Sequence, residues 1–371
     1  MTGFTPLDIE ACGVLSPAGF GLTALGTALR TGQPGHADPA GIGTEPFPAR
    51  TPVRVVPDLA VTERLGRKGT RNLDRTTVLG LLAVQEAITA LGEEFGEDGR
   101  DQTGVVFGTS AGGTGAIGDF ARDTVVQERP YLVNPAQFSN LVLNCCASQI
   151  AIRHRFTGVN ATMVGGHLSG LLAWRYARNT LRLGRARRLF VGAVEELSPQ
   201  SAWAWRRSGA LRPRSAVGEG AAMFSVTPAG QGKAPLARVV ACEVGFHAPS
   251  GTAGQNKAAL ALASCVERAL DTAGVDRQQI TTVAVGASAQ SGLGEIEQEA
   301  LALALGDSEN RQQLVISDVL GETYGASTAL QLAALLAVWQ EEPVSDAGEY
   351  GLVTSYDRDG GLGCLLVQRP N

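Results

Sequence analysis

The chain has 371 residues, of which 44% are hydrophobic and 47 are glycine, and its net charge is −5. This composition excludes a disordered protein, the negative charge argues against a nucleic-acid partner, and no apolar run reaches the roughly 18 residues of a membrane span. The first residues carry no basic region followed by an apolar core, and the six cysteines lie mostly in apolar runs. We therefore expect a cytoplasmic protein with reduced thiols and no membrane partner.

In chain order, the predicted elements begin with a surface loop at residues 32–54, which is rich in glycine and proline. An apolar strand is predicted at 104–107. A second strand at 159–164 leads into a helix at 168–183, which ends at Gly184. These strands are continuously apolar and alternate with helices, which is typical of strands buried on both faces in mostly parallel α/β layers.

The second half of the chain repeats this order. A helix end, a loop, an apolar strand and a glycine turn at residues 87–110 recur at 269–288. The helix at 168–183 and its following strand recur at 326–354. A chain of this length exceeds the usual size of one domain, so we expect a duplicated architecture.

Residues 165–170, Gly-Gly-His-Leu-Ser-Gly, are the most informative stretch. A strand, a tight turn and a helix N-terminus place backbone N–H groups and the helix dipole where they stabilise a thiolate or an oxyanion. His167 occupies the apex in place of a nucleophile. The dipole opposes an imidazolium, so we expect a neutral ring. Three roles stay open for it: inert packing, a hydrogen bond to a ligand in a pocket, or action as a base.

This arrangement resembles the β-ketoacyl-ACP synthase family, in which such a turn carries the acylated cysteine within Ala-Cys-x-Ser-Gly or a near variant. Residues 12–19 look like the family's opening strand and turn, and residues 192–196 look like its Gly-Gly-Ala-Glu run. Residues 211–213 and 217–222 are similar to its Arg-Pro-Phe and Gly-Glu-Gly-Ala signature.

The resemblance covers residues 8–368, nearly the whole chain. It implies a thiolase-like α/β fold with duplicated halves in αβαβα layers. Applied to this chain, it implies an N-terminal half at residues 1–235 and a C-terminal half at residues 236–371.

The resemblance also implies that the catalytic positions have lost their chemistry. His167 stands at the cysteine position, Val285 at the first catalytic histidine, Ser317 at the lysine and Glu322 at the second histidine. Residues 357–361, Asp-Arg-Asp-Gly-Gly, replace the Phe-Gly-Phe-Gly-Gly gate. Condensation needs a thiolate, hydrogen-bond donors to the carbonyl and an oriented base, so these replacements indicate a subunit without catalytic residues, cofactor or metal.

The chain is most similar in this respect to the chain length factor of a type II polyketide synthase in antibiotic biosynthesis. Such a subunit forms a heterodimer with an active ketosynthase, receives chains from an acyl carrier protein, and shapes the polyketide or polyene tunnel. The resemblance implies that the strand near 158–164 pairs across the dimer axis. Residues 134–140 resemble the part that reaches across it. Our tunnel and interface candidates are Gln137, Phe138, Met163 and His167.

Other motifs allow other interpretations. Residues 108–112 match the G-x-S-x-G nucleophile elbow, so a divergent thiolase-fold acyltransferase or hydrolase using Ser110 or His167 is the alternative function. No histidine follows His247, which favours a structural Ser110. Glu195 and Glu196 are expected to point to opposite faces. An arginine cluster favours either a solvated face or docking of the acidic carrier protein; it comprises Arg185, Arg187, Arg188, Arg206, Arg207, Arg212 and Arg214.

Overall fold

The computed structural model describes residues 5–92, 97–231, 235–248, 255–306, 311–341 and 349–370. Its strands are β1 (Leu7–Ser16), β2 (Gly19–Phe20), β3 (Val53–Arg54), β4 (Thr103–Gly108), β5 (Asn160–Met163), β6 (Arg188–Glu195), β7 (Val217–Gly218), β8 (Gly220–Pro228), β9 (Ala237–Phe246), β10 (Ile280–Val285), β11 (Gln312–Val315), β12 (Tyr350–Tyr356) and β13 (Gly361–Gln368).

The α-helices are α1 (Gly21–Thr31), α2 (Val61–Leu65), α3 (Arg75–Leu91), α4 (Glu97–Arg100), α5 (Thr114–Val126), α6 (Cys145–His154), α7 (Ser169–Arg182), α8 (Pro199–Ser208), α9 (Gln255–Ala273), α10 (Leu293–Leu305), α11 (Ile316–Leu320) and α12 (Ser327–Glu341). Short 3-10 helices are η1 (Pro135–Leu141), η2 (Gly166–Leu168), η4 (Arg277–Gln279) and η5 (Tyr324–Ala326).

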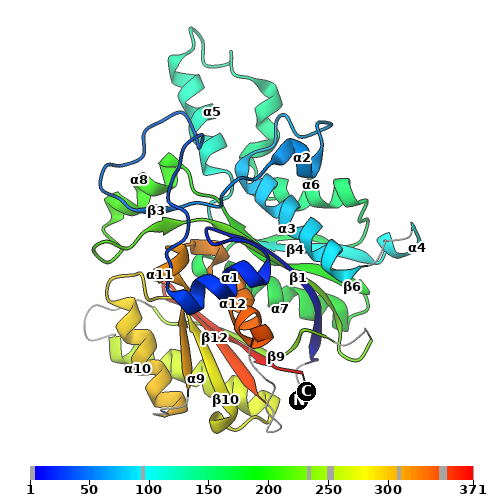
Figure 1. Ribbon diagram of the computed structural model, residues 1–371, viewed down its shortest axis with the longest axis vertical. Helices are drawn as coiled ribbons and strands as arrows, with labels where there is room; N and C mark the ends of the chain where they lie inside the picture. The colour runs from blue at the N-terminus through cyan, green and yellow to red at the C-terminus, as the bar shows by residue number, and fades with distance from the viewer. Residues whose placement is uncertain are drawn as a thin grey trace.

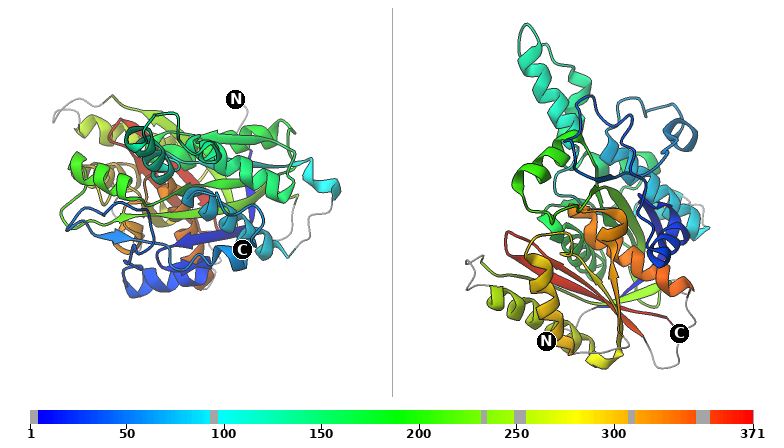
Figure 2. Two further views of the ribbon diagram at one scale, coloured as in Figure 1. Left: turned by 90° about the horizontal axis from the view of Figure 1, so that it is seen from above. Right: turned by 60° about the vertical axis from the view of Figure 1, so that its left-hand side comes forward.

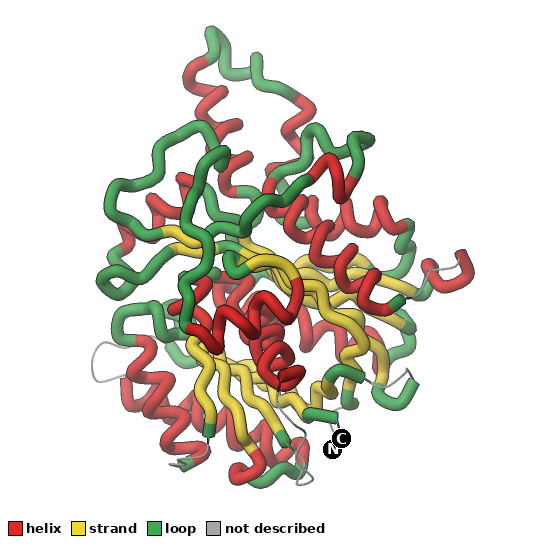
Figure 3. The backbone as a smooth tube through the Cα atoms, viewed as in Figure 1, coloured by secondary structure: helices red, strands yellow, loops and turns green. Residues whose placement is uncertain are grey.

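One mixed sheet runs through the described residues, with its strands in yellow in Figure 3. Its strand order is β11-β10-β12-β13-β9-β1-β8-β6-β4-β5, with β2 paired to β1. Each half of the sheet has the same pattern. In the first half β5, β4 and β6 are parallel, and β8 and β1 follow antiparallel. In the second half β11, β10 and β12 are parallel, and β13 and β9 follow antiparallel. This pattern confirms the predicted duplicated α/β fold.

The two halves are joined where Leu7, Asp8 and Ile9 of β1 pair with Val239, Arg238 and Ala237 of β9. The division at residue 235 stays a prediction.

The helices form one layer between the two halves of the sheet and one layer outside each half (Figure 1). Helices α7 and α12 lie in the middle and pack on strands of both halves. Helices α3 and α6 cover the outer face of the first half, and α9 and α10 lie outside the second. The largest buried cluster is built from the two central helices and the inner faces of both halves, including Trp174, Leu330 and Phe224. Burying a continuous apolar surface of this kind is the main stabilising term of the fold.

Both central helices begin beside one another. Helix α7 follows η2 and α12 follows η5, and these two short helices are in contact. The predicted helix at 168–183 is confirmed as Ser169–Arg182, with Gly184 in the left-handed region just beyond it. The duplication therefore brings residues 166–168 and 322–326 together, although they are far apart in the sequence.

The region of α5 and η1 projects from the body of the molecule (Figure 2). No residue of α5 is buried. The predicted surface loop at 32–54 forms no regular element in the described structure before β3. All six cysteines are buried and free. Among the helices of the described ranges, none combines the length and apolar character needed to cross a bilayer.

Candidate functional site

The turn between β5 and α7 is held by a small hydrogen-bond network. Gly166 has φ +59°, a conformation that favours glycine. The Ser169 hydroxyl accepts from the Gly165 N–H at 3.1 Å. The Ser110 hydroxyl donates to the Gly166 carbonyl at 2.7 Å and lies 3.0 Å from the Ser169 hydroxyl. The G-x-S-x-G serine is thus part of the support of the His167 turn, as the sequence favoured.

His167 is buried between two carboxylates, with only 2% of its surface exposed. Its Nε2 lies 3.1 Å from Glu322 Oε1, and its Nδ1 lies 3.3 Å from Asp357 Oδ2. Its backbone N–H also donates to Asp357 Oδ2, at 2.9 Å. Asp357 therefore accepts the backbone N–H that the turn presents and lies within ion-pair distance of the ring Nδ1.

The two carboxylates reverse the protonation state that the sequence predicted. Burial disfavours a charged imidazole, but Glu322 and Asp357 outweigh this effect and raise the pKa of His167 to about 10. Burial also opposes the charge on Asp357, yet His167 lowers the pKa of that carboxyl below its usual value. The expectation of a neutral ring was wrong, because it considered the helix dipole and could not see two carboxylates from distant segments.

Further side chains fix the ring in place. Gln290 Nε2 lies 2.9 Å from His167 Nε2, where it can donate only to a neutral ring nitrogen; rotation of the amide would present its oxygen to the protonated ring. The rings of Tyr324 and Trp205 meet the imidazole edge to face, with centroids at 4.8 and 6.2 Å. The Tyr324 N–H donates to Glu322 Oε1 at 2.8 Å, which fixes that carboxylate. The polar atoms of the cluster are therefore committed largely to one another.

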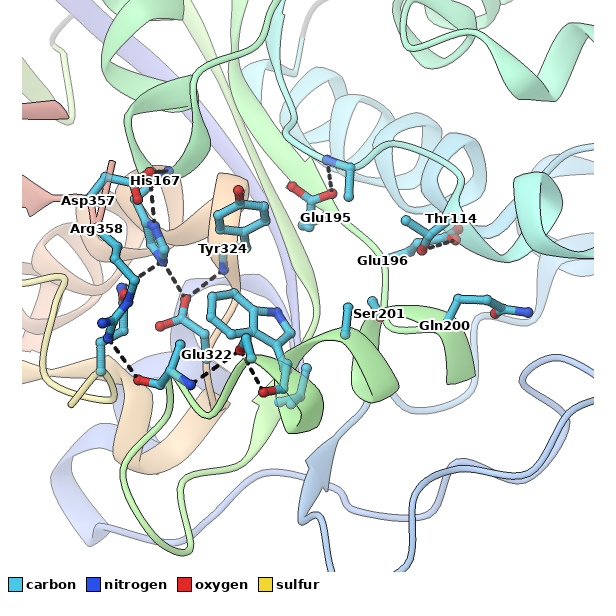
Figure 4. A pocket seen from close by; sticks show the side chains of 18 of the residues that line it. Thr114, His167, Glu195, Glu196, Gln200, Ser201, Glu322, Tyr324, Asp357 and Arg358 are labelled. Atoms are coloured by element: carbon cyan, nitrogen blue, oxygen red, sulfur yellow. Dashed lines mark hydrogen bonds and ion pairs between the residues drawn. The ribbon is translucent and has the colours of Figure 1, made fainter. Parts of the chain in front are cut away.

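A cavity of about 500 Å³ opens beside this cluster (Figure 4). His167, Glu322, Tyr324, Asp357 and Arg358 lie at one end, and Glu196, Thr114 and Gln200 lie at the other. Trp205, Ala204, Ala210 and Val217 also line the cavity. The described lining residues include no cysteine. The cavity thus offers an apolar volume beside a group that can donate hydrogen bonds but lacks a thiol nucleophile.

Two buried carboxylates support the cavity walls. Glu195 accepts from the N–H groups of Ser110 and Ala111, and Glu196 accepts from those of Thr76 and Gly115. Their different partners confirm that the two side chains point in different directions. Burial raises the pKa of each to about 7 despite these donors. Because each carboxylate is tied to backbone donors, we assign both to positioning of the turns.

The described cavity lining omits several predicted site residues. Val285 is buried in the core of the second half, and Ser317 lies in α11. Gln137, Phe138 and Met163 lie outside the lining as well. Of the predicted positions, only His167 and Glu322 are brought together. The degenerate roles of Val285 and Ser317 stay predictions, as do the tunnel roles.

The sequence prediction missed Asp357, Gln290 and Tyr324 as partners of His167. Asp357 was noted only as part of a loop that lacks the gate phenylalanines. A charged residue directly after β12, a strand that contains Leu352 and Val353, was the available signal, because a buried carboxylate needs a partner.

A substitution at Gly166 measures how closely Asp357 packs against the turn. A Cβ there would lie 1.9 Å from Asp357 Oδ2, in addition to the cost of φ +59°. We expect Gly166→Ala to lower the unfolding free energy by at least about 3 kcal/mol. The control is Gly184→Ala, where φ is +65° and no atom lies within 4 Å, so only about 1–2 kcal/mol is expected. Equal losses in urea unfolding would show that Asp357 does not close the turn.

The chain matches the beta-ketoacyl synthase N-terminal domain over residues 11–231 and the beta-ketoacyl synthase C-terminal domain over residues 236–346. It is similar to the 3-oxoacyl-[acyl-carrier-protein] synthase 2 of Vibrio cholerae serotype O1, with 25% identity over 356 residues, 87% of this chain and 83% of that relative.

Among solved structures, a chain of the ishigamide ketosynthase/chain length factor is 32% identical, with a TM-score of 0.85, 99% of this chain and all of the other covered. A type II PKS acyl-carrier protein complex with its ketosynthase bound to the hexaketide contains a chain that is 15% identical. Its TM-score is 0.77, with 98% of this chain and 99% of that one covered, so it shares the fold.

Proposed function

Because the chain belongs to the beta-ketoacyl synthase family, we propose that it is a non-condensing partner subunit, a chain length factor. It pairs with an active ketosynthase, and the pair takes up chains from an acyl carrier protein. In this proposal the subunit shapes the tunnel that limits the length of the polyketide or polyene.

The observation that carries the proposal is the state of the nucleophile turn. His167 stands at its apex and is held between Glu322 and Asp357, and its backbone N–H already donates to Asp357. A thioester oxygen would need that donor free, and a thiolate would be repelled by both carboxylates. The site therefore lacks the nucleophile and its electrostatic support together.

The exposed surface supports a partner. Strand β5 is the last strand of the described sheet and pairs only with β4 there, so one edge of its backbone is open. The projecting region displays large apolar side chains, including Val125 at 81% and Phe138 at 63% exposure, with Tyr131 and Val126 between them. Exposed apolar groups in this concentration are typical of a protein–protein interface.

The similarity to a chain of the ishigamide ketosynthase/chain length factor, at 32% identity over nearly the full length, supports a heterodimeric partner. The alternative function is an acyltransferase or hydrolase that uses Ser110 or His167. The hydrogen bonds and ion pairs of these two side chains do not support it. The Ser110 hydroxyl donates to a backbone carbonyl, and the two nitrogens of the His167 ring face carboxylates.

Co-expression with a type II ketosynthase tests the proposal. We expect size-exclusion and mass analysis to show a one-to-one complex. Only this complex should elongate an acyl chain with malonyl units from the carrier protein. The chain alone should show no acyl transfer and no thioester hydrolysis. A stable homodimer with activity of its own would support the enzyme alternative, and Ser110→Ala and His167→Ala would then identify the residue responsible.

The role of Phe138 is tested in the same complex. Its ring packs edge to face on Phe120, with centroids 6.4 Å apart, on the projecting region. If Phe138 limits the tunnel, Phe138→Ala adds volume and should lengthen the product by at least one extender unit. Phe246→Ala is the matched control, since Phe246 is 70% exposed and lies at the end of β9. An unchanged product distribution for Phe138→Ala would remove this residue from the tunnel.

A further inference from the structure

The charges of this chain are distributed unevenly along its sequence. The chain as a whole has a net charge of −5, yet residues 129–194 contain nine arginines, no lysine, no aspartate and no glutamate. Because this run of 66 residues contains no carboxylate side chain, any carboxylate that pairs with its arginines must come from another part of the chain.

This carboxylate-free segment builds one end of the sheet. It forms η1, α6, β5, η2 and α7 in succession, followed by most of β6. Strand β5 ends the described sheet, and α6 and α7 both pack against it. The positive charge is thus gathered on the elements that flank the open edge.

A stripe of arginines follows the exposed face of α7. Arg175, Arg178 and Arg182 are spaced three and four residues apart, so they lie on one side of the helix. Arg175 and Arg182 are exposed, and neither has a carboxylate partner among the described residues. By contrast, Arg188, the first residue of β6, is ion-paired with Glu10 at 2.7 Å.

Apolar side chains lie on the same elements. Ile152 of α6 is 70% exposed, Val164 just after β5 is 49% exposed, and Tyr176 of α7 is also exposed. We call the surface formed by Ile152, Val164, Arg175, Tyr176 and Arg182 the edge surface. The edge surface thus combines an open strand edge, exposed apolar side chains and arginines without a carboxylate partner. This combination is typical of a stable protein–protein interface with a partner that carries acidic residues.

We infer that the edge surface selects a ketosynthase partner with acidic residues beside its own edge strand and rejects a second copy of this chain. The inference rests on the proposed function and specifies the partner for the same interface. In a twofold homodimer each surface patch meets its own copy. The α7 arginines would then face one another, and like charges brought together in an interface oppose association. An acidic partner removes this repulsion and gains complementary pairs.

Binding to the ketosynthase and self-association of this chain are expected to differ in their dependence on salt concentration. We expect the dissociation constant of the complex with the ketosynthase to rise at least about tenfold between 50 and 500 mM NaCl, because salt screens opposite charges. Self-association of this chain should respond in the opposite direction, since salt screens the repulsion between arginines. Sedimentation equilibrium measures both. The same salt dependence for both associations would overturn the inference.

Charge reversal gives a second test. In Arg175→Glu/Arg182→Glu, binding to the ketosynthase should weaken by about tenfold or more. A mixture of this variant with the wild-type chain should associate more strongly than either alone. Lys257→Glu/Arg277→Glu is the matched control, because both residues are exposed on α9 and η4 and the net charge changes equally. All these positions lie on the surface, so folding is checked by equal thermal midpoints.

The outcomes distinguish the inference from the proposed function. If the wild-type chain forms no complex with a ketosynthase, the proposed function fails. If the complex forms and the α7 variant binds as tightly as the control variant, the proposed function stands and the inference is wrong. Loss of carrier-protein binding with an intact heterodimer would also overturn it, because the arginines would then serve the carrier protein.

Discussion

Replacing His167 by alanine is expected to lower the free energy of unfolding by about 3–5 kcal/mol at pH 7. The variant leaves Glu322 and Asp357 buried without the imidazolium that lies 3.1 and 3.3 Å from them. Breaking a buried pair by removing one partner is costly, because the remaining charge loses its counter-ion and cannot regain water. Urea unfolding of the wild type and the variant measures the difference.

The pH dependence of this loss identifies its cause. The folded-state pKa of His167 is raised to about 10 from an ordinary value near 6.5. Its stabilisation is therefore fully present below about pH 6.5 and is lost as the pH rises toward 10. The difference between wild type and His167→Ala should be largest near pH 6 and should shrink by pH 10.

His154 provides a matched control, because its pKa is shifted in the opposite direction from that of His167. Burial and nearby arginines lower the pKa of His154 to about 4. Its folded state excludes a proton that the unfolded chain binds, so stability is lost as the pH falls from 6.5 toward 4. His154→Ala should therefore reduce the sensitivity to acid. A loss for His167→Ala below 1 kcal/mol, with no pH dependence, would contradict the ion-paired site.

A cysteine placed at position 167 is expected to stay unreactive until Asp357 is removed. In His167→Cys the thiol lies at the N-terminus of α7, where the dipole favours a thiolate. Asp357 and Glu322 oppose that effect by their charge, and Asp357 still accepts the N–H of residue 167. In His167→Cys/Asp357→Ala the donor is free and one negative charge is gone. We expect alkylation by iodoacetamide at least about tenfold faster than in the single variant, since each unit of thiol pKa changes the thiolate fraction tenfold.

Intact-mass analysis over time measures this reaction. The wild-type chain is the control for background, because all six of its cysteines are buried. His167→Cys/Glu322→Gln tests whether charge alone suffices, since it removes one carboxylate charge and leaves the Asp357 contact in place. Equal rates for the single variant and the Asp357 double variant would show that Asp357 does not suppress the site.

The fold was largely predictable from the sequence because its signals are local. Continuous apolar strands, helix ends at glycine and the repeated order at residues 87–110 and 269–288 depend only on neighbours in the chain. Strand β4 (Thr103–Gly108) and helix α7 (Ser169–Arg182) accordingly lie where the pattern placed them. The absence of a nucleophile at the apex of residues 165–170 is likewise a property of the sequence itself.

Only the tertiary structure decided what surrounds His167. Asp357 and Gln290 are separated from it by 190 and 123 residues, and the duplicated topology brings them to the start of α7. From the sequence, the helix dipole predicted a neutral His167 ring. In the folded chain, two carboxylates lie beside the ring and favour its charged form. Composition fixed how many arginines and carboxylates the chain has, and packing fixed which are paired. The protonation of a buried group depends on charges within a few ångströms, and that distance has no counterpart in sequence separation.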